Sequence, residues 1–93
     1  MAAHGPKWLV LAALVSLAPD TPGVIELWDD DELVYIGATR RSQTVRTQLE
    51  RELAAHAEAT HFSWEITFRP EARSRELIAE FELQHHRRPR LNP

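Results

Sequence analysis

The stretch from Gly23 to Gly37 constrains the fold of this chain more than any other. It contains two short apolar runs, Val-Ile-Glu-Leu-Trp and Leu-Val-Tyr-Ile, separated by four acidic residues. Valine, isoleucine, tryptophan and tyrosine favour extended backbone, and an aspartate-rich break between two such runs is typical of a hairpin turn. We therefore predict a hairpin with strands at residues 23–28 and 33–37.

A helix is predicted directly after the hairpin. Apolar residues recur at steps of four, four and three from Val45 to His56, which gives one apolar stripe. Ser42 precedes this stripe, and its hydroxyl could accept a hydrogen bond from the open amides of the first turn. The pattern predicts a helix over residues 43–57 with Ser42 as its N-cap.

A further strand and a further helix follow. Residues 60–68 alternate between apolar and polar side chains, and the apolar set is Phe62, Trp64, Ile66 and Phe68. This period of two predicts a half-buried strand. Residues 71–86 follow a proline and have an apolar side, which predicts a second long helix.

The N-terminal segment carries an apolar run at residues 8–17. This run is too short to span a bilayer, which takes about 20 apolar residues. It has roughly the length of a signal-peptide core, but the small-residue cleavage site of a signal peptide does not follow it. We predict a short apolar-faced helix over residues 7–17. Pro19 and Pro22 then end the helix and make a rigid connector into the hairpin.

The predicted order of elements is helix, strand, strand, helix, strand, helix. The economical packing for this order is an α+β (α/β) fold with a small, three-stranded, mostly antiparallel sheet flanked by helices. A chain of 93 residues is long enough for one such domain, over residues 1–93. Residues 1–21 would be its N-terminal helix and connector, and residues 22–92 its core.

Composition restricts the classes of function. Hydrophobic residues make up 43% and charged residues 27%, as in ordinary soluble domains. No cysteine is present, which excludes a disulfide framework and a thiolate metal site and favours an intracellular, cytoplasmic protein with no membrane partner. The formal net charge of −3 gives the whole chain no attraction for nucleic acid.

Basic side chains are nevertheless concentrated in two groups, which could form a local anion-binding face if they lie together. The alternative for the second group is positive charge at a helix C-terminus, where it complements the helix dipole. The first group is Arg40, Arg41 and Arg46, and the second is Arg87, Arg88 and Arg90.

The hairpin residues carry a family resemblance. Gly-Val-Ile at residues 23–25, followed ten residues on by Tyr-Ile-Gly at residues 35–37, resembles the paired motif of the GIY-YIG nucleases. Arg46 lies in the predicted helix after the second motif, where the family carries an arginine.

The resemblance continues to the C-terminus. Glu80 lies in the last predicted helix, and nine residues on the chain reads Pro-Arg-Leu-Asn, ending at Asn92. This ending is similar to the Pro-Arg-Tyr-Asn of the repair-type members, which include the N-terminal nuclease domain of the bacterial excision-repair endonuclease. The resemblance covers residues 22–92.

The resemblance implies metal-dependent endonuclease activity, the hydrolysis of phosphodiester bonds in DNA. Glu80 would hold one Mg²⁺ or Mn²⁺ ion, which prefers oxygen ligands. Tyr35 would position or deprotonate the attacking water, and Arg46 would neutralise charge that develops on the phosphate. Asn92 would steady this catalytic site. The basic residues expected to contact nucleic acid are Arg40, Arg41, Arg87, Arg88 and Arg90.

Two positions depart from the family pattern and leave an alternative open. The tyrosine of the first motif is Ile25, which can neither donate a hydrogen bond nor accept a proton. Ala38 follows the second motif, where repair-type members often carry lysine. The alternative is a catalytically inactive relative that acts as a nucleic-acid-binding or protein-interaction module.

Each catalytic candidate also has a purely structural interpretation. Tyr35 can be a core residue with its hydroxyl at the surface. Glu80 and Arg46 can be solvated side chains on the flanks of amphipathic helices. The acidic run at residues 29–32 is explained by the hairpin turn rather than by a metal site.

Overall fold

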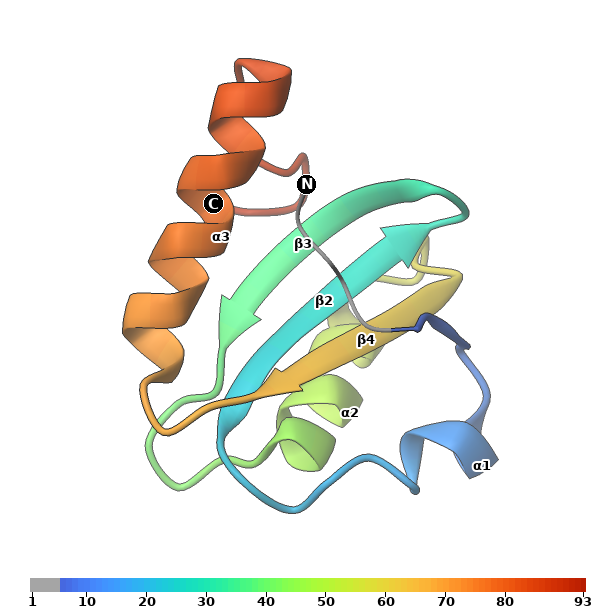
Figure 1. Ribbon diagram of the computed structural model, residues 1–93. Coiled ribbons are helices and arrows are strands. Elements are labelled where there is room, and N and C mark those ends of the chain that lie inside the picture. The colour runs from blue at the N-terminus through green and yellow to red at the C-terminus, as the bar shows by residue number, and fades with distance from the viewer. Residues whose placement is uncertain (1–5) are drawn as a thin grey trace.

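The computed structural model describes residues 6–93, which form four strands and three helices. The elements are β1 (Trp8–Leu9), α1 (Ala12–Val15), β2 (Gly23–Asp29), β3 (Glu32–Ala38), α2 (Val45–Ala55), β4 (His61–Ile66) and α3 (Pro70–His85). The strands make one antiparallel sheet in the order β1-β4-β2-β3 (Figure 1). The predicted α+β class and the antiparallel pairing are confirmed.

The hairpin is β2 and β3, and each strand extends within one residue of the predicted bounds. Asp30 and Asp31 make the turn between the strands. Asp30 has a φ of 53°, a left-handed conformation that aspartate tolerates better than most residues. The pairing runs from Asp29 opposite Glu32 to the other end of the hairpin, with an irregularity after Leu27. The acidic run therefore forms the hairpin turn and the strand ends beside it, as predicted.

The prediction of three strands is wrong, because the N-terminal segment adds a fourth. β1 pairs antiparallel with β4 and places Trp8 opposite Phe62. The Trp8 ring also stacks on Trp64, with 6.0 Å between the ring centroids. Sheet hydrogen bonds and ring stacking favour extended backbone at this position, so the predicted helix over residues 7–17 is reduced to the four residues of α1.

Helices cover both faces of the sheet, because the side chains of β2 are buried on both sides (Figure 1). Alternate residues of β2 belong to two separate clusters, which we name the α2 core and the α3 core. The α2 core contains Val15, Ala18, Ile25, Leu27, Val34, Val45, Leu49, Ala59 and Phe62. The α3 core contains Val24, Leu33, Ile36, Leu77 and Phe81.

The two long predicted helices are confirmed, but the predicted cap of the first is wrong. Thr44, not Ser42, is the N-cap of α2. The Thr44 hydroxyl accepts from the Thr47 amide at 3.3 Å, and the Thr47 hydroxyl accepts from the Thr44 amide at 2.8 Å. Ser42 instead lies in the preceding turn with a φ of 73°. α3 starts one residue before the predicted position, at Pro70.

β4 is shorter than the strand predicted over residues 60–68. Phe62 is fully buried and Trp64 packs at the margin of the α2 core, as the alternation predicts. Ile66 is 53% exposed and Phe68 is 91% exposed. The expected apolar face is thus buried only over its first half, because the α2 core ends at Trp64.

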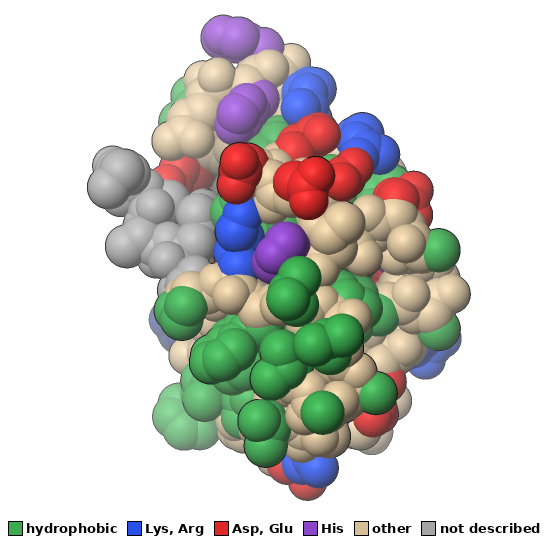
Figure 2. Space-filling view, turned by 90° about the vertical axis from the view of Figure 1, so that its right-hand side faces the viewer, with side chains coloured by type: hydrophobic (Ala, Val, Ile, Leu, Met, Phe, Trp, Pro, Cys, Tyr) green, Lys and Arg blue, Asp and Glu red, His purple; other side chains and the backbone are tan. Residues whose placement is uncertain are grey.

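An apolar patch lies on the face that carries α1 and β1, where Figure 2 shows hydrophobic side chains gathered together. Trp8, Leu14, Leu17 and Trp64 line a shallow hollow of about 150 Å³ in this region. Leu17 is the most exposed of the four. None of the helices within residues 6–93 is long and apolar enough to cross a membrane.

The C-terminal tail closes the outer edge of β3. The Leu91 amide donates to the Val34 carbonyl at 2.9 Å. The Asn92 side chain brackets Ile36, since its Oδ1 accepts from the Ile36 amide at 3.0 Å and its Nδ2 donates to the Ile36 carbonyl at 2.9 Å. Pro89 is fully buried beside this contact. The tail therefore satisfies backbone groups that an edge strand would leave open.

Replacing Asn92 tests this edge contact. Asn92→Ala removes both hydrogen bonds to Ile36, and we expect the free energy of unfolding to fall by about 1–3 kcal/mol. Urea denaturation followed by circular dichroism measures the change. Leu83→Ala is the control, because Leu83 is 80% exposed on α3 and its loss should leave stability nearly unchanged. Equal denaturation midpoints for Asn92→Ala and the unmodified chain would contradict the assignment.

Candidate functional site

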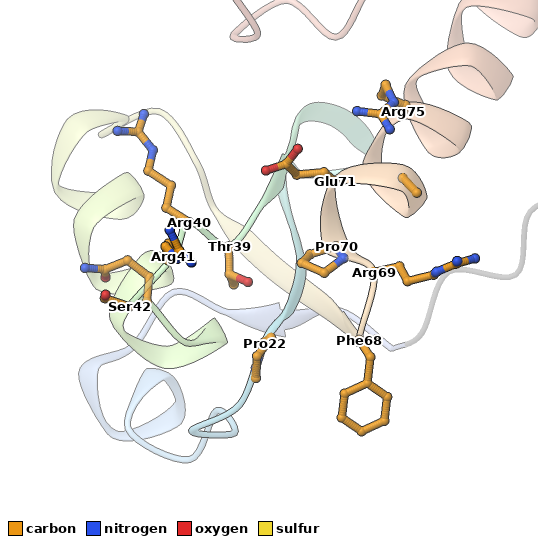
Figure 3. Close-up of a pocket in the computed structure, with 12 residues that line it drawn as sticks. Pro22, Thr39, Arg40, Arg41, Ser42, Phe68, Arg69, Pro70, Glu71 and Arg75 are labelled. Atoms are coloured by element: carbon orange, nitrogen blue, oxygen red, sulfur yellow. The ribbon is translucent and has the colours of Figure 1, made fainter.

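A cavity of about 960 Å³ lies at the end of the sheet where β3 and β4 stop (Figure 3). It is lined by residues 39–43, residues 68–72, Pro22 and Arg75, and we call it the basic pocket. The two lining segments meet because β2 pairs antiparallel with both of its neighbours. The C-terminal ends of β3 and β4 therefore lie together at the Gly23 end of β2.

Positive charge dominates the lining of the basic pocket. Arg40 and Arg41 come from the turn before α2, and Arg69 and Arg75 come from the start of α3, on the opposite side of the pocket (Figure 3). Glu71 is the one acidic residue among the twelve that line the cavity. Within residues 6–93 none of these four arginines forms an ion pair. The pocket is thus a local excess of positive charge on an acidic chain.

The turn that carries two of these arginines has a fixed backbone. Thr39 is buried, its amide donates to the Gly23 carbonyl at 2.9 Å, and its hydroxyl accepts from the Gly23 amide at 3.1 Å. The Gln43 amide then closes the turn on the Arg40 carbonyl at 2.9 Å. Glycine is required at residue 23, because a Cβ there would collide with the Glu65 carbonyl of β4.

The first turn of α3 forms the other wall of the basic pocket. Arg69 is the N-cap and makes no side-chain capping hydrogen bond, and Pro70 follows at the first helical position. The first amides of a helix have no partner inside the helix and carry a partial positive charge. This end of the helix borders the cavity, because Glu71 and Ala72 are among the residues that line it. Four arginines and a helix N-terminus together favour a bound anion.

Arg73 belongs to the same helix but is not part of this anion site. Its guanidinium binds both carboxylate oxygens of Glu65, at 2.7 and 3.2 Å, and Glu76 at 3.0 Å. The hydrogen bonds to these two carboxylates raise the pKa of Arg73. They also offset its charge, so Arg73 joins α3 to β4 rather than attracting a ligand.

Tyr35 lies on β3 and is half-buried at the edge of the α2 core. Its ring rests over Gly37, where an added Cβ would lie 2.5 Å from the Tyr35 hydroxyl, and its centroid is 5.5 Å from that of His56. Burial raises the pKa of the Tyr35 hydroxyl, and the nearby Glu52 carboxylate raises it further, against a smaller lowering by Arg40. The hydroxyl is therefore protonated at neutral pH.

Arg46 lies at the start of α2, whereas the Tyr35 ring contacts His56 just after the end of this helix. Its backbone amide donates to the Pro19 carbonyl at 3.1 Å, and its Nη2 lies 3.5 Å from the Asp20 carboxylate. Its Nε is buried with no hydrogen-bond partner among the described residues. Arg46 therefore holds the connector before β2. Glu50, suggested as a partner by its spacing, makes no ion pair with it.

Glu80 lies on α3, which packs on the α3 core, whereas Tyr35 packs on the α2 core on the other face of the sheet. The part of the chain that the structure describes contains no group of three or more His, Asp or Glu side chains that could hold a metal ion. Glu80, Tyr35 and Arg46 share no hydrogen bond or ion pair within that part. Tyr35 and Glu80 are thus carried by elements that pack on opposite faces of the sheet.

The C-terminal basic group does not meet the group at residues 40–46. Arg90 contacts Asp29 at 2.8 Å and Glu32 at 3.5 Å, and Arg87 contacts Glu32 at 3.4 Å. The tail arginines thus pair with the acidic hairpin tip, at the opposite end of α3 from the basic pocket. Arg88 forms no ion pair within residues 6–93. Asn92, whose expected role was to steady the site, fixes the backbone of β3 immediately after Tyr35.

Sequence reasoning missed Arg69, Arg75 and Phe68 as parts of the candidate site. The available signal was Pro70, which marks a helix start directly after Phe68 and Arg69 and shortly before Arg75. These residues form a site only together with the end of β3, which lies about 30 residues earlier in the sequence.

Comparisons with known proteins give a family but no activity. No curated protein and no solved structure matches the chain. The family described as "Domain of unknown function (DUF7508)" matches residues 6–84. Because this match spans most of its length, the chain belongs to that family.

Proposed function

We propose that this chain binds the phosphate backbone of nucleic acid, DNA in the first place, through the basic pocket. The observation that carries the proposal is that Arg40, Arg41, Arg69 and Arg75 all line the cavity at the N-terminus of α3. Guanidinium groups present planar hydrogen-bond donors that match phosphate oxygens, and helix amides add further donors.

The charge balance makes the pocket, rather than the whole chain, the site of attraction. A net charge of −3 repels nucleic acid at long range, so binding must come from one concentrated basic surface. The tail arginines Arg87 and Arg90 are already paired with carboxylates, whereas the pocket arginines form no ion pair within residues 6–93.

The sequence resemblance supports the same class of ligand. Residues 22–92 carry, in order, sequence pieces that resemble the motifs of the GIY-YIG nucleases, whose substrates are nucleic acids, and they fold into a sheet flanked by helices. We interpret the fold as a GIY-YIG-like domain. We also expect a cytoplasmic location, because the chain has no cysteine for disulfide bonds.

The arrangement favours binding over hydrolysis. Tyr35 and Glu80 lie on opposite faces of the sheet, and Arg46 binds the connector through Asp20. Ile25, which occupies the first-motif tyrosine position, is completely buried in the α2 core. Its hydrocarbon side chain has no polar group, and its burial keeps it from contacting a substrate.

The proposal is tested with a variant that carries Arg41→Ala and Arg75→Ala, one arginine from each side of the pocket. Each lost phosphate contact should weaken binding to any DNA sequence and reduce the slope of log K against log[salt] by about 1. Fluorescence anisotropy with a labelled oligonucleotide at several salt concentrations measures both quantities.

Arg88→Ala is the matched control, because Arg88 is an exposed arginine at the other end of α3. The control should bind DNA as the unmodified chain does. If Arg88→Ala weakens binding as strongly as the pocket variant, the tail and not the pocket is the nucleic-acid surface, and the proposal fails.

Phosphodiester hydrolysis with one Mg²⁺ or Mn²⁺ ion is the second candidate function. The observation that favours it is Tyr35, the single tyrosine of the chain, whose ring is held over Gly37. Burial and Glu52 raise the pKa of its hydroxyl, and the Arg40 guanidinium offsets part of this rise. A phosphate in the basic pocket would lie at the end of the strand that carries this hydroxyl.

A plasmid-nicking assay with added Mg²⁺ or Mn²⁺ tests the second candidate. If the chain is a nuclease of this kind, Tyr35→Phe and Glu80→Gln should each lower the nicking rate by at least tenfold, because each removes a group that the chemistry needs. Unfolding midpoints measured in parallel show whether both variants are folded. Nicking that survives both substitutions would contradict this assignment.

A further inference from the structure

Phe68 is the most exposed large apolar side chain of the structure's described residues, at 91%. It lies at the rim of the basic pocket, next to Arg69 in sequence, and its ring projects away from the pocket walls in Figure 3. Single exposed apolar residues are common and need no explanation by themselves. The position of this one, beside four arginines that form no ion pair, is what sets it apart.

Phe68 also follows, two residues beyond the end of β4, a row of apolar side chains on that strand. Trp64 and Ile66 point to the same face of the sheet, opposite Ile25 and Gly23 of β2. Exposure rises along the row, from fully buried Phe62 through half-buried Trp64 to Ile66 at 53% and Phe68 at 91%. The row therefore leads from the α2 core to an exposed aromatic ring at the mouth of a positively charged cavity.

We propose that Phe68 is a stacking platform for a base and that the basic pocket takes an unpaired nucleotide of a single-stranded nucleic acid. This inference rests on the proposed function and specifies its ligand. The phosphate lies against the pocket arginines and the α3 N-terminus, and the adjoining base lies on the Phe68 ring. An aromatic ring beside a positively charged groove is the combination by which proteins hold single strands without reading their sequence.

The geometry distinguishes a single strand from a duplex. Bases inside a duplex are stacked on each other and cannot place a face on a side chain. A duplex can still present its phosphates to the arginines, since those contacts need only the backbone. Phe68 has no hydrogen-bonding group, so it contributes affinity for any unpaired base and no preference among bases.

The test compares a single-stranded oligothymidine with a duplex of the same length, using the complete chain and fluorescence anisotropy. Phe68→Ala should weaken binding of the single strand by roughly tenfold or more. It should leave binding of the duplex and the salt dependence unchanged, because no phosphate contact is lost. Phe68→Trp should keep or strengthen binding of the single strand. Leu83→Ala, which removes another exposed apolar side chain away from the pocket, should change neither.

The outcomes separate this inference from the function on which it rests. If Arg41→Ala with Arg75→Ala weakens binding of both oligonucleotides while Phe68→Ala weakens neither, or weakens both equally, the stacking role is refuted and phosphate binding stands. If the unmodified chain binds neither oligonucleotide, both proposals are refuted. Because Phe68 is outside every strand and helix and exposed, its removal should leave the unfolding midpoint unchanged, and a shifted midpoint would also count against the assignment.

Discussion

The burial of Gly23 to Leu27 on both faces of the sheet is the constraint on which the rest of the structure depends. A strand buried on both sides needs a helical layer above and below it, and α2 and α3 supply these layers. The same strand pairs antiparallel with two neighbours, so both neighbours end beside Gly23. The turns that lead into α2 and α3 therefore meet there, and they bring the arginines of the basic pocket together. The candidate site is a consequence of the sheet topology.

The fold could be predicted from local patterns where these patterns were strong. The hairpin and both long helices follow from β-forming residues, periodicity and proline, and the structure has them within about two residues at each end. β1 could not be predicted, because two residues carry no period and the apolar run around them also fits a helix. Its strand conformation is set by pairing with Phe62 and stacking on Trp64, which are 54 and 56 residues away from Trp8.

The candidate site could be predicted less well, because it depends on contacts between distant segments. Arg40 and Arg41 were identified from the clustering of charge. Arg69 and Arg75 join them only because β4 ends next to β3, which places both pairs on the lining of one pocket. The two basic groups stay apart because α3, 16 residues long, separates their ends by about 24 Å. The C-terminal Pro-Arg-Leu-Asn, which resembles the ending of repair-type nucleases, has a clear structural role here, as Asn92 closes the edge of β3.

The most direct test of the central claim is a titration of the isotopically labelled chain with a short single-stranded oligonucleotide, followed by amide chemical shifts. If the basic pocket is the binding site, the largest shifts should occur in residues 39–43 and 68–72, and they should diminish at high salt. Largest shifts at the tail, in residues 87–92, or no shifts at all at millimolar oligonucleotide, would contradict the account.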